Sequence, residues 1–191
     1  MQESDVLATA FADTIALHQR VMQGDTRPIL DAVAAIVLSM RRRGTLLVFG
    51  NGGSASDAQH VAAELVGRFQ RSRRALAAVA ITADTSVLTS IGNDAGFDRV
   101  FARQVEALAR EGDVALGIST SGGSPNVVAA LDTARAQGAR TIALTGGDGG
   151  PVGRAADIHI NIASNSTPRV QEVHRTVLHV ICDLVERAFV A

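Results

Sequence analysis

The feature that most constrains the fold is the alternation of short apolar segments with helical patterns after residue 44. The short segments are nearly all apolar, as expected for parallel strands that are covered on both faces. The longer segments between them repeat apolar residues with helical periodicity. This order predicts a doubly wound α/β fold, with a parallel five-stranded sheet flanked by helices. The predicted strands are 45–50, 76–82, 114–119, 141–145 and 157–162, and the predicted helices are 54–68, 97–110, 125–137 and 168–189.

Two more helices are predicted ahead of the sheet, over 6–22 and 28–43. The second ends in the arginine run 41–43, whose positive charges favour the carbonyl end of a helix, and Gly44 is a typical stop signal. We find no linker, low-complexity tract or internal repeat that would divide the chain. We therefore expect residues 1–191 to form one domain, with residues 1–43 used in packing and oligomerisation.

Composition and charge narrow the class of protein. Hydrophobic residues make up 47% of the chain and charged residues 19%, which is typical of a globular protein. The net charge of −1 gives no basic surface for nucleic acid or an anionic membrane, and no apolar run approaches the roughly 18 residues that span a bilayer. The single Cys182 excludes an intrachain disulfide and indicates a reducing compartment. We expect a cytoplasmic protein that binds neither nucleic acid nor membrane.

The chain contains no lysine, because all 18 of its Lys and Arg residues are Arg. This absence excludes enzymes that form a Schiff base through lysine, including those that use pyridoxal phosphate. It also excludes the nucleotide-binding P-loop, whose signature requires lysine. Any phosphate must therefore be held by backbone N–H groups, hydroxyls or arginine.

Two glycine-rich loops follow predicted strands, at the edge of the sheet where ligands of such folds bind. The second loop reads STSGGSPN, with Ser124 placed as a helix N-cap and Pro125 as the first helical residue. A helix N-terminus surrounded by hydroxyls suits a phosphate monoester, although a turn of this kind also forms without a ligand. The hydroxyls belong to Ser119, Thr120, Ser121 and Ser124.

The first loop, GNGGSAS, also matches a dinucleotide-binding pattern through Gly50, Gly52 and Ala55. Such a site needs an acidic residue about 20 positions further on, and Asp84 comes much later. We therefore disfavour a dinucleotide site. The third loop, TGGDGGPVG after Thr145, is expected to be only a connection.

His60 and Glu64 stand four residues apart, on one face of a predicted helix. Such a pair can form half of a divalent-metal site, act as acid and base, or make only a surface hydrogen bond. On the last predicted helix, Gln171 and His179 are about 12 Å apart along the axis. A site that they share would lie midway between them, beside another element or subunit.

The other histidines have less chemical promise. His174 is three residues from Gln171 and competes with it for a place in the site, with packing or capping as the alternative. His18 lies in a predicted amphipathic helix and His159 in a predicted strand, so we expect both to be structural.

Four motifs occur in order along nearly the whole chain: FGNGGSASDAQHVAAEL, GND at 92–94, GISTSGGSPNV and RVQEVHRTVLH. Together they resemble the sedoheptulose 7-phosphate isomerases, or phosphoheptose isomerases, of the sugar isomerase (SIS) domain superfamily. The resemblance implies an SIS-type fold and an aldose–ketose isomerase that makes glycero-manno-heptose 7-phosphate through an enediol(ate), as a lipopolysaccharide precursor for the cell envelope. It also implies a homotetramer with active sites between subunits.

The same resemblance implies roles for particular residues. Glu64 is the implied base and His179 its acid/base partner, while His60, Glu64, Gln171 and His179 are implied to hold one zinc ion per subunit. A carboxylate bound to zinc is a poorer base, so the two roles of Glu64 are in tension, and zinc could instead polarise substrate oxygens. The implied substrate contacts are Asn51, Gly52, Gly53, Glu64, Asn93, Asp94, Ser119, Thr120, Ser121, Ser124 and Gln171.

Two other functions use the same fold. A relative in the superfamily is a tetrameric, non-catalytic adaptor that binds a replication initiator and lacks the glutamate and the final histidine. The presence of Glu64 and His179 favours the enzyme. A sugar-phosphate sensor without turnover would use the same loops, and the sequence leaves it open.

Overall fold

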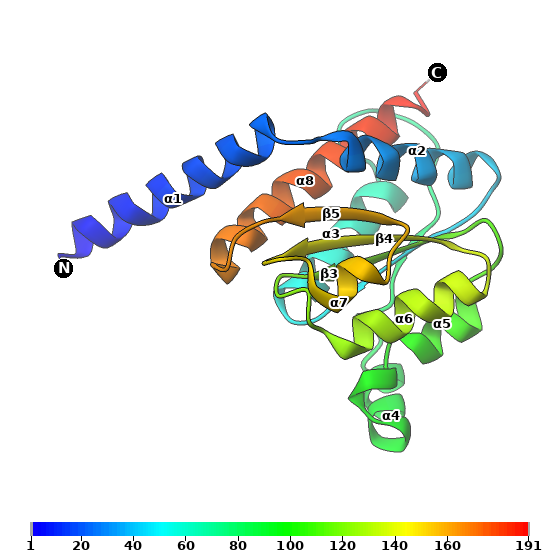
Figure 1. Ribbon diagram of the computed structural model, residues 1–191. Helices are drawn as coiled ribbons and strands as arrows, with labels where there is room; N and C mark the ends of the chain where they lie inside the picture. The colour runs from blue at the N-terminus through cyan, green and yellow to red at the C-terminus, as the bar shows by residue number, and fades with distance from the viewer. Residues whose placement is uncertain (1, 191) are drawn as a thin grey trace.

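The structure, a computed structural model, describes residues 2–190, and Met1 and Ala191 lie outside the described residues. Its centre is a parallel five-stranded sheet with the strand order β2-β1-β3-β4-β5 (Figure 1). This confirms the predicted doubly wound α/β fold. The strands are β1 (Leu46–Gly50), β2 (Ala78–Ala80), β3 (Val114–Ser119), β4 (Arg140–Gly146) and β5 (Ile158–Ile162).

The sheet separates two apolar cores because successive strand residues point to opposite faces. On β1, Leu46 and Val48 enter one core, and Leu47 and Phe49 enter the other. The first core is covered by α2 (Arg27–Arg41), α3 (Gly53–Val66) and α8 (Thr167–Arg187), and the second by α5 (Ala102–Leu108), α6 (Pro125–Ala136) and α7 (Gly150–Arg154).

Four elements differ from the sequence-based prediction, and one of them is α7, a short helix in the loop that was expected to be only a connection. The helix predicted over 97–110 is divided into a 3-10 turn, Phe97–Arg99, and α5. The helix α4 (Thr85–Ala95) was not predicted, because it is rich in β-branched residues and ends in Gly, Asn and Asp, all poor helix formers. The strand β2 is shorter than predicted, as it is an edge strand that pairs with β1 alone.

The end of α2 also differs in detail from the prediction. The left-handed residue after the helix is Arg43, with φ of 66°, and not Gly44. The Gly44 N–H donates to the Ser39 carbonyl at 2.9 Å, and a Cβ at Gly44 would overlap the Ser39 hydroxyl. Glycine is therefore needed at residue 44 because the backbone there lies close to Ser39. The left-handed conformation that ends the helix falls on Arg43, one residue before it.

The first helix, α1 (Glu3–Gln23), projects from the body of the molecule (Figure 1). Of its described residues only Leu17 is buried. It packs on α8 through Leu17, and the His18 Nε2 lies 2.8 Å from the Thr176 hydroxyl, which gives His18 the structural role expected of it. The large apolar side chains that α1 leaves more than half exposed are Leu7, Phe11, Ile15 and Met22.

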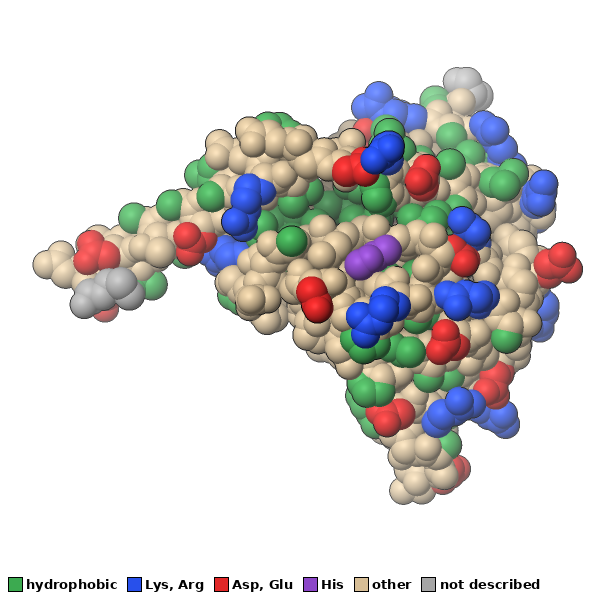
Figure 2. Space-filling model, in the orientation of Figure 1, with side chains coloured by type: hydrophobic (Ala, Val, Ile, Leu, Met, Phe, Trp, Pro, Cys, Tyr) green, Lys and Arg blue, Asp and Glu red, His purple; other side chains and the backbone are tan. Residues whose placement is uncertain are grey.

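The molecular surface carries charges of both signs. Figure 2 shows arginine side chains intermingled with Asp and Glu over one face, without a large area of a single sign. None of the helices within residues 2–190 has the length and apolar character that crossing a membrane requires.

Candidate active site

The candidate site is built along the contact between α3 and α8, which pack side by side on one face of the sheet. Each helix begins just after the carboxyl end of a parallel strand, so the two run in the same general direction and their residues meet in order. The facing pairs are Gly53 with Gln171, Asp57 with Arg175, and His60, which also contacts Glu64, with His179.

The third pairing brings two imidazoles and a carboxylate together within one chain. The His60 Nε2 lies 2.8 Å from the His179 Nε2 and 3.5 Å from a carboxylate oxygen of Glu64. The two rings meet edge to face, with centroids 5.0 Å apart. Burial lowers the pKa of His179 below its usual value, and the nearby His60 and Arg175 add to this effect, so the His179 imidazole is neutral at pH 7. The group can therefore accept, hold or pass a proton.

Gln171 lies at a different level of the same helix pair. Its side-chain amide covers the backbone of Gly53, and a Cβ on residue 53 would overlap that amide. Gln171 and His179 thus contact α3 at positions seven residues apart. The single chain brings three of the four residues implied to hold zinc to one point and sets Gln171 beside the first glycine-rich loop.

The donor atoms at this point suit zinc, which binds imidazole nitrogen and carboxylate oxygen. Their spacing is that of a hydrogen-bonded group, and among residues 2–190 no three His, Cys, Asp or Glu side chains are grouped as a metal ion would require. Two nitrogens that bind one tetrahedral zinc ion stand about 3.3 Å apart. The two histidine nitrogens, 2.8 Å apart, would have to separate by about 0.5 Å to hold an ion.

The hydroxyl-rich loop joins β3 to α6 at the carboxyl edge of the sheet. Ser124 is the N-cap residue and Pro125 begins α6, as predicted, but the Ser124 hydroxyl lies 2.9 Å from that of Ser119 and caps no described N–H group of the helix. The Ser121 hydroxyl accepts from the Gly123 N–H at 3.2 Å. Pro125 has no N–H, and the N–H groups of Val127 and Val128 both donate to the Ser124 carbonyl at 3.1 Å. Among the described contacts, the Asn126 N–H is therefore the donor of this first turn left available to an anion, with the serine hydroxyls and Thr120 in the same turn.

The third glycine-rich loop does more than connect two elements. It contains α7, a single helical turn, and the Val152 N–H donates to the Gly122 carbonyl at 2.9 Å. Gly122 has a φ of 67°, and a Cβ there would lie 2.5 Å from the Gly149 carbonyl oxygen. The third glycine-rich loop therefore packs against the hydroxyl-rich turn and supports it. The sequence analysis did not predict this contact.

Asn126 is a residue of the site that the sequence analysis missed. Its side-chain amide exchanges two hydrogen bonds of 2.9 Å with that of Asn51, which links α6 to the first glycine-rich loop beside Gly52. Asn126 is only 2% exposed. The sequence carried one signal of this contact. Asparagine is a poor helix former, and Asn126 stands at the second position of a helix, where a side chain can reach the neighbouring loop.

The sequence analysis also assigned no role to Asp57 and Arg175. They meet between the contact of Gly53 with Gln171 and the contact of His60 with His179. The Asp57 carboxylate is fully buried and lies 2.5 Å from the Arg175 guanidinium. Its oxygens accept no hydrogen bond from the described residues. No sequence spacing links these two residues, which are over one hundred positions apart.

The structure separates Asn93 and Asp94 from the α3–α8 cluster. Both are exposed on α4, which projects from the body (Figure 1), and the Asn93 amide donates to Asp94 at 2.8 Å. His174 is fully buried with its Nε2 3.0 Å from the Thr145 carbonyl, so it packs and does not compete with Gln171. His159 contacts the Thr145 hydroxyl at 2.7 Å, and burial lowers the pKa of both histidines.

Comparison with known proteins agrees with this architecture. The SIS domain family matches residues 11–146, so the chain contains an SIS domain. The chain is 57% identical to the phosphoheptose isomerase of Geobacter sp. (strain M21) over 167 residues, which cover 87% of each chain. It is 51% identical to the phosphoheptose isomerase of Pelobacter propionicus over 188 residues, 98% of this chain and 99% of the other.

Solved structures give the same result. Phosphoheptose isomerase GmhA from Neisseria gonorrhoeae matches with a TM-score of 0.92 and 42% identity, over 97% of this chain and all of that one. A phosphoheptose isomerase from Francisella tularensis matches with a TM-score of 0.94 and 34% identity, over 98% of this chain and all of that one. The protein belongs to the phosphoheptose isomerase family of SIS-domain enzymes, which confirms the resemblance carried by its four motifs.

The contact between Gly53 and Gln171 can be tested by substitution. We expect Gly53→Ala to push the Gln171 amide aside, because the added methyl group overlaps the end of a flexible side chain. Because the family resemblance assigns Gln171 to the substrate, displacing its amide should lower kcat/KM by about tenfold to a hundredfold, with the melting temperature changed by only a few degrees. In a Gln171→Ala background the same substitution should cause little further loss of kcat/KM. A full additional loss there would show that Gly53 acts independently of Gln171.

Proposed function

We propose that the protein is an aldose–ketose isomerase that converts sedoheptulose 7-phosphate to glycero-manno-heptose 7-phosphate through an enediol(ate). The observation that carries the proposal is the meeting of Glu64, His60 and His179 at distances of 2.8 and 3.5 Å, in a fold shared with phosphoheptose isomerases. The relatives' names favour this activity over a non-catalytic adaptor. A sensor that binds sugar phosphate without turnover has no need of the acid/base group.

The chemistry moves a proton between two adjacent carbons, which needs a base at the carbon and a hydrogen-bond donor at the oxygen. Glu64 takes the proton from carbon 1 of the ketose and returns it to carbon 2. His179 donates to the oxygen on carbon 2 and accepts a proton from the hydroxyl on carbon 1. His60, within 3.5 Å of both partners, holds the two groups in place.

The loops at the carboxyl edge of the sheet would bind the rest of the substrate. The hydroxyl-rich turn and the N-terminus of α6 offer an uncharged cradle for the phosphate. The first loop approaches the sugar closely at Gly52 and Gly53, and Asn51 and Gln171 present amides. The residues that we assign to the substrate are Asn51, Gly52, Gly53, Glu64, Asn93, Asp94, Ser119, Thr120, Ser121, Ser124 and Gln171.

We also propose one zinc ion per subunit. His60, Glu64 and His179 supply donors that zinc accepts, and Gln171 would complete the set if α8 or a side chain shifts. When bound, zinc would polarise the substrate oxygens on carbons 1 and 2. Glu64 would then share its charge with the ion and become a weaker base.

The exposed apolar side chains of α1 support a homotetramer. Leu7, Phe11 and Ile15 recur every four residues, which places them on one stripe of the projecting helix. A stripe of this kind needs another protein surface to cover it, and a second copy of the chain is the partner we propose. Active sites at the interface would let a neighbouring subunit bring Asn93 and Asp94 to the sugar. We place the protein in the cytoplasm, making heptose for lipopolysaccharide in the cell envelope.

The proposed activity can be tested by incubating the purified protein with sedoheptulose 7-phosphate and following the aldose phosphate formed. We expect turnover by the wild type, and a fall of about a thousandfold or more in kcat for Glu64→Gln and for His179→Gln, since each removes a proton-transfer group. The exposed Glu111 and the structural His18 provide matched controls, and Glu111→Gln and His18→Gln should retain activity. Wild-type protein that binds the sugar without converting it would favour the sensor.

The zinc proposal has its own measurement. We expect metal analysis of protein purified without chelator to find one zinc ion per subunit, and about none in the double variant His60→Ala/His179→Ala, because two ligands are lost. Removal of the ion with a chelator should lower kcat, and zinc should restore it. If the wild type holds no zinc and a chelator leaves kcat unchanged, the residues act without metal.

The assembly can be tested by sedimentation. We expect the wild type to sediment as a tetramer and Phe11→Asp to shift it to smaller species, because the substitution buries a charge in the proposed interface. Thr9→Asp adds the same charge on the opposite side of α1 and should leave the tetramer intact. A monomeric wild type, or equal effects of the two variants, would contradict this use of α1.

A further inference from the structure

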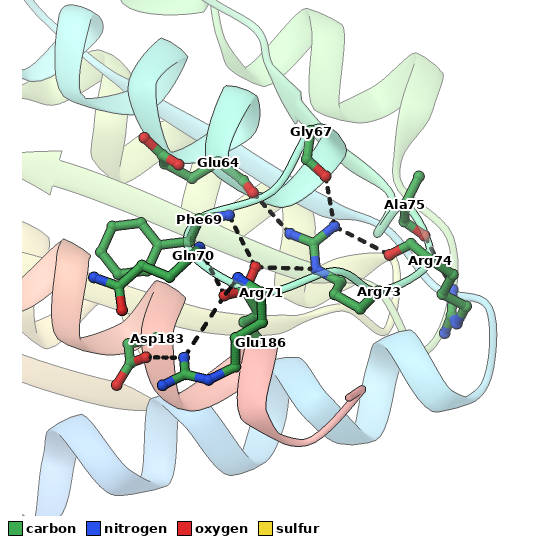
Figure 3. A network of polar contacts seen from close by, with 10 residues as sticks. All are labelled: Glu64, Gly67, Phe69, Gln70, Arg71, Arg73, Arg74, Ala75, Asp183 and Glu186. Carbon is green, nitrogen blue, oxygen red and sulfur yellow. Dashed lines mark hydrogen bonds and ion pairs between the residues drawn. The ribbon is translucent and has the colours of Figure 1, made fainter. Parts of the chain in front are cut away.

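The loop between α3 and β2, residues 67–77, is anchored to α8 by a buried carboxylate (Figure 3). The Glu186 side chain is fully buried and accepts the backbone N–H groups of Phe69 at 2.9 Å, Gln70 at 2.8 Å and Arg71 at 2.8 Å. Burial alone would raise the pKa of Glu186, but these donors and the nearby Arg73 lower it overall. The carboxylate is thus ionised at neutral pH and binds three consecutive peptide groups.

Arg73 connects the same anchor to the end of α3 (Figure 3). Its buried guanidinium lies 3.5 Å from Glu186 and donates to the carbonyl groups of Gly67 and Glu64, each at 2.8 Å. These carbonyls belong to the last turn of α3, where a cation is favourable. The backbone of Glu64 is therefore tied through one guanidinium to Glu186.

Phe69 carries the anchored loop to the active site. Its ring lies 5.5 Å from the His179 ring, centroid to centroid, at an interplanar angle of 32°. The edge of His60 lies against the same imidazole. Since the Phe69 N–H is itself bound by Glu186, the position of the aromatic ring depends on that carboxylate. His179 is a partly exposed side chain, so Phe69 adds to the contact with His60 in fixing its ring.

We propose that Glu186 is a positioning residue for the isomerase reaction: it holds Phe69 against His179 and, through Arg73, fixes the end of α3 that carries Glu64. The proposal rests on the catalytic roles proposed for Glu64 and His179. A second ion pair, between Arg71 and Asp183 at 2.5 Å, fastens the same loop to the same helix but contacts neither catalytic residue. Asp183 therefore provides a matched control for an effect of the loop's attachment alone.

The experiment compares Glu186→Gln, Phe69→Leu and their combination with Asp183→Asn. We expect kcat to fall about tenfold in Glu186→Gln and in Phe69→Leu, with KM changed less than about twofold, because a misplaced imidazole affects the chemical step. The double variant should lose no more kcat than Glu186→Gln alone, since the Phe69 contact is already lost in that variant. Asp183→Asn should keep kcat within about twofold of the wild type.

A second measurement does not depend on turnover. The imidazole resonances of His179, assigned with His179→Gln, should shift in Glu186→Gln and Phe69→Leu because the aromatic neighbour moves, while those of His18 stay in place. If the wild type fails to isomerise sugar phosphates, the proposed function is wrong, but these resonances still test the contact. Unchanged His179 resonances, or additive losses of kcat in the double variant, overturn the proposal. If Glu186→Gln does not fold, Glu186→Asp, which keeps the charge and shortens the side chain, replaces it in both measurements.

Discussion

The packing of α3 against α8 is the interaction on which the site depends. Both helices start at the carboxyl edge of the parallel sheet, and their buried faces, with Val61 and Leu65 on α3 and Leu178 and Cys182 on α8, enter the same core. Only one register of this contact sets His60 against His179. A slip of one helical turn, about 5.4 Å, would separate the imidazoles and the carboxylate beyond hydrogen-bond reach. The apolar core therefore sets the chemical distances.

Backbone geometry supplies most of the rest of the site. A chain without lysine must bind phosphate through N–H groups, hydroxyls or arginine, and the groups that we propose for it are the start of α6 and the serine hydroxyls. The amide pair of Asn51 and Asn126 ties the first glycine-rich loop to the start of α6, and the close approach of Gly122 to the third loop supports the hydroxyl-rich turn. These contacts are made before a substrate arrives, so little ordering remains to be done on binding.

The sequence predicted the parts of the fold whose residues are buried on both sides. The strand at 114–119 matched at both ends because it is nearly all apolar, whereas the edge strand β2 and the exposed helix α4 carry a weaker pattern. Four motifs led to the family and to Glu64 and His179. The contacts of Asn126 and Glu186 were not predictable from spacing. Asn126 is 75 positions from its partner in the chain, and Glu186 is 115 to 117 positions from the peptide groups that it binds. Such pairs are defined by the packed helices and not by local pattern.

The most direct measurement is a crystal structure of the complete assembly with a sugar phosphate bound. The proposed site predicts that the phosphate lies against Ser119, Ser121 and Ser124. It also predicts that the first two carbons of the sugar lie between Glu64 and His179, with Phe69 still packed on the imidazole. A structure in which Glu64 and His179 face separate regions, with the sugar at neither, would contradict proton transfer by this pair in any subunit.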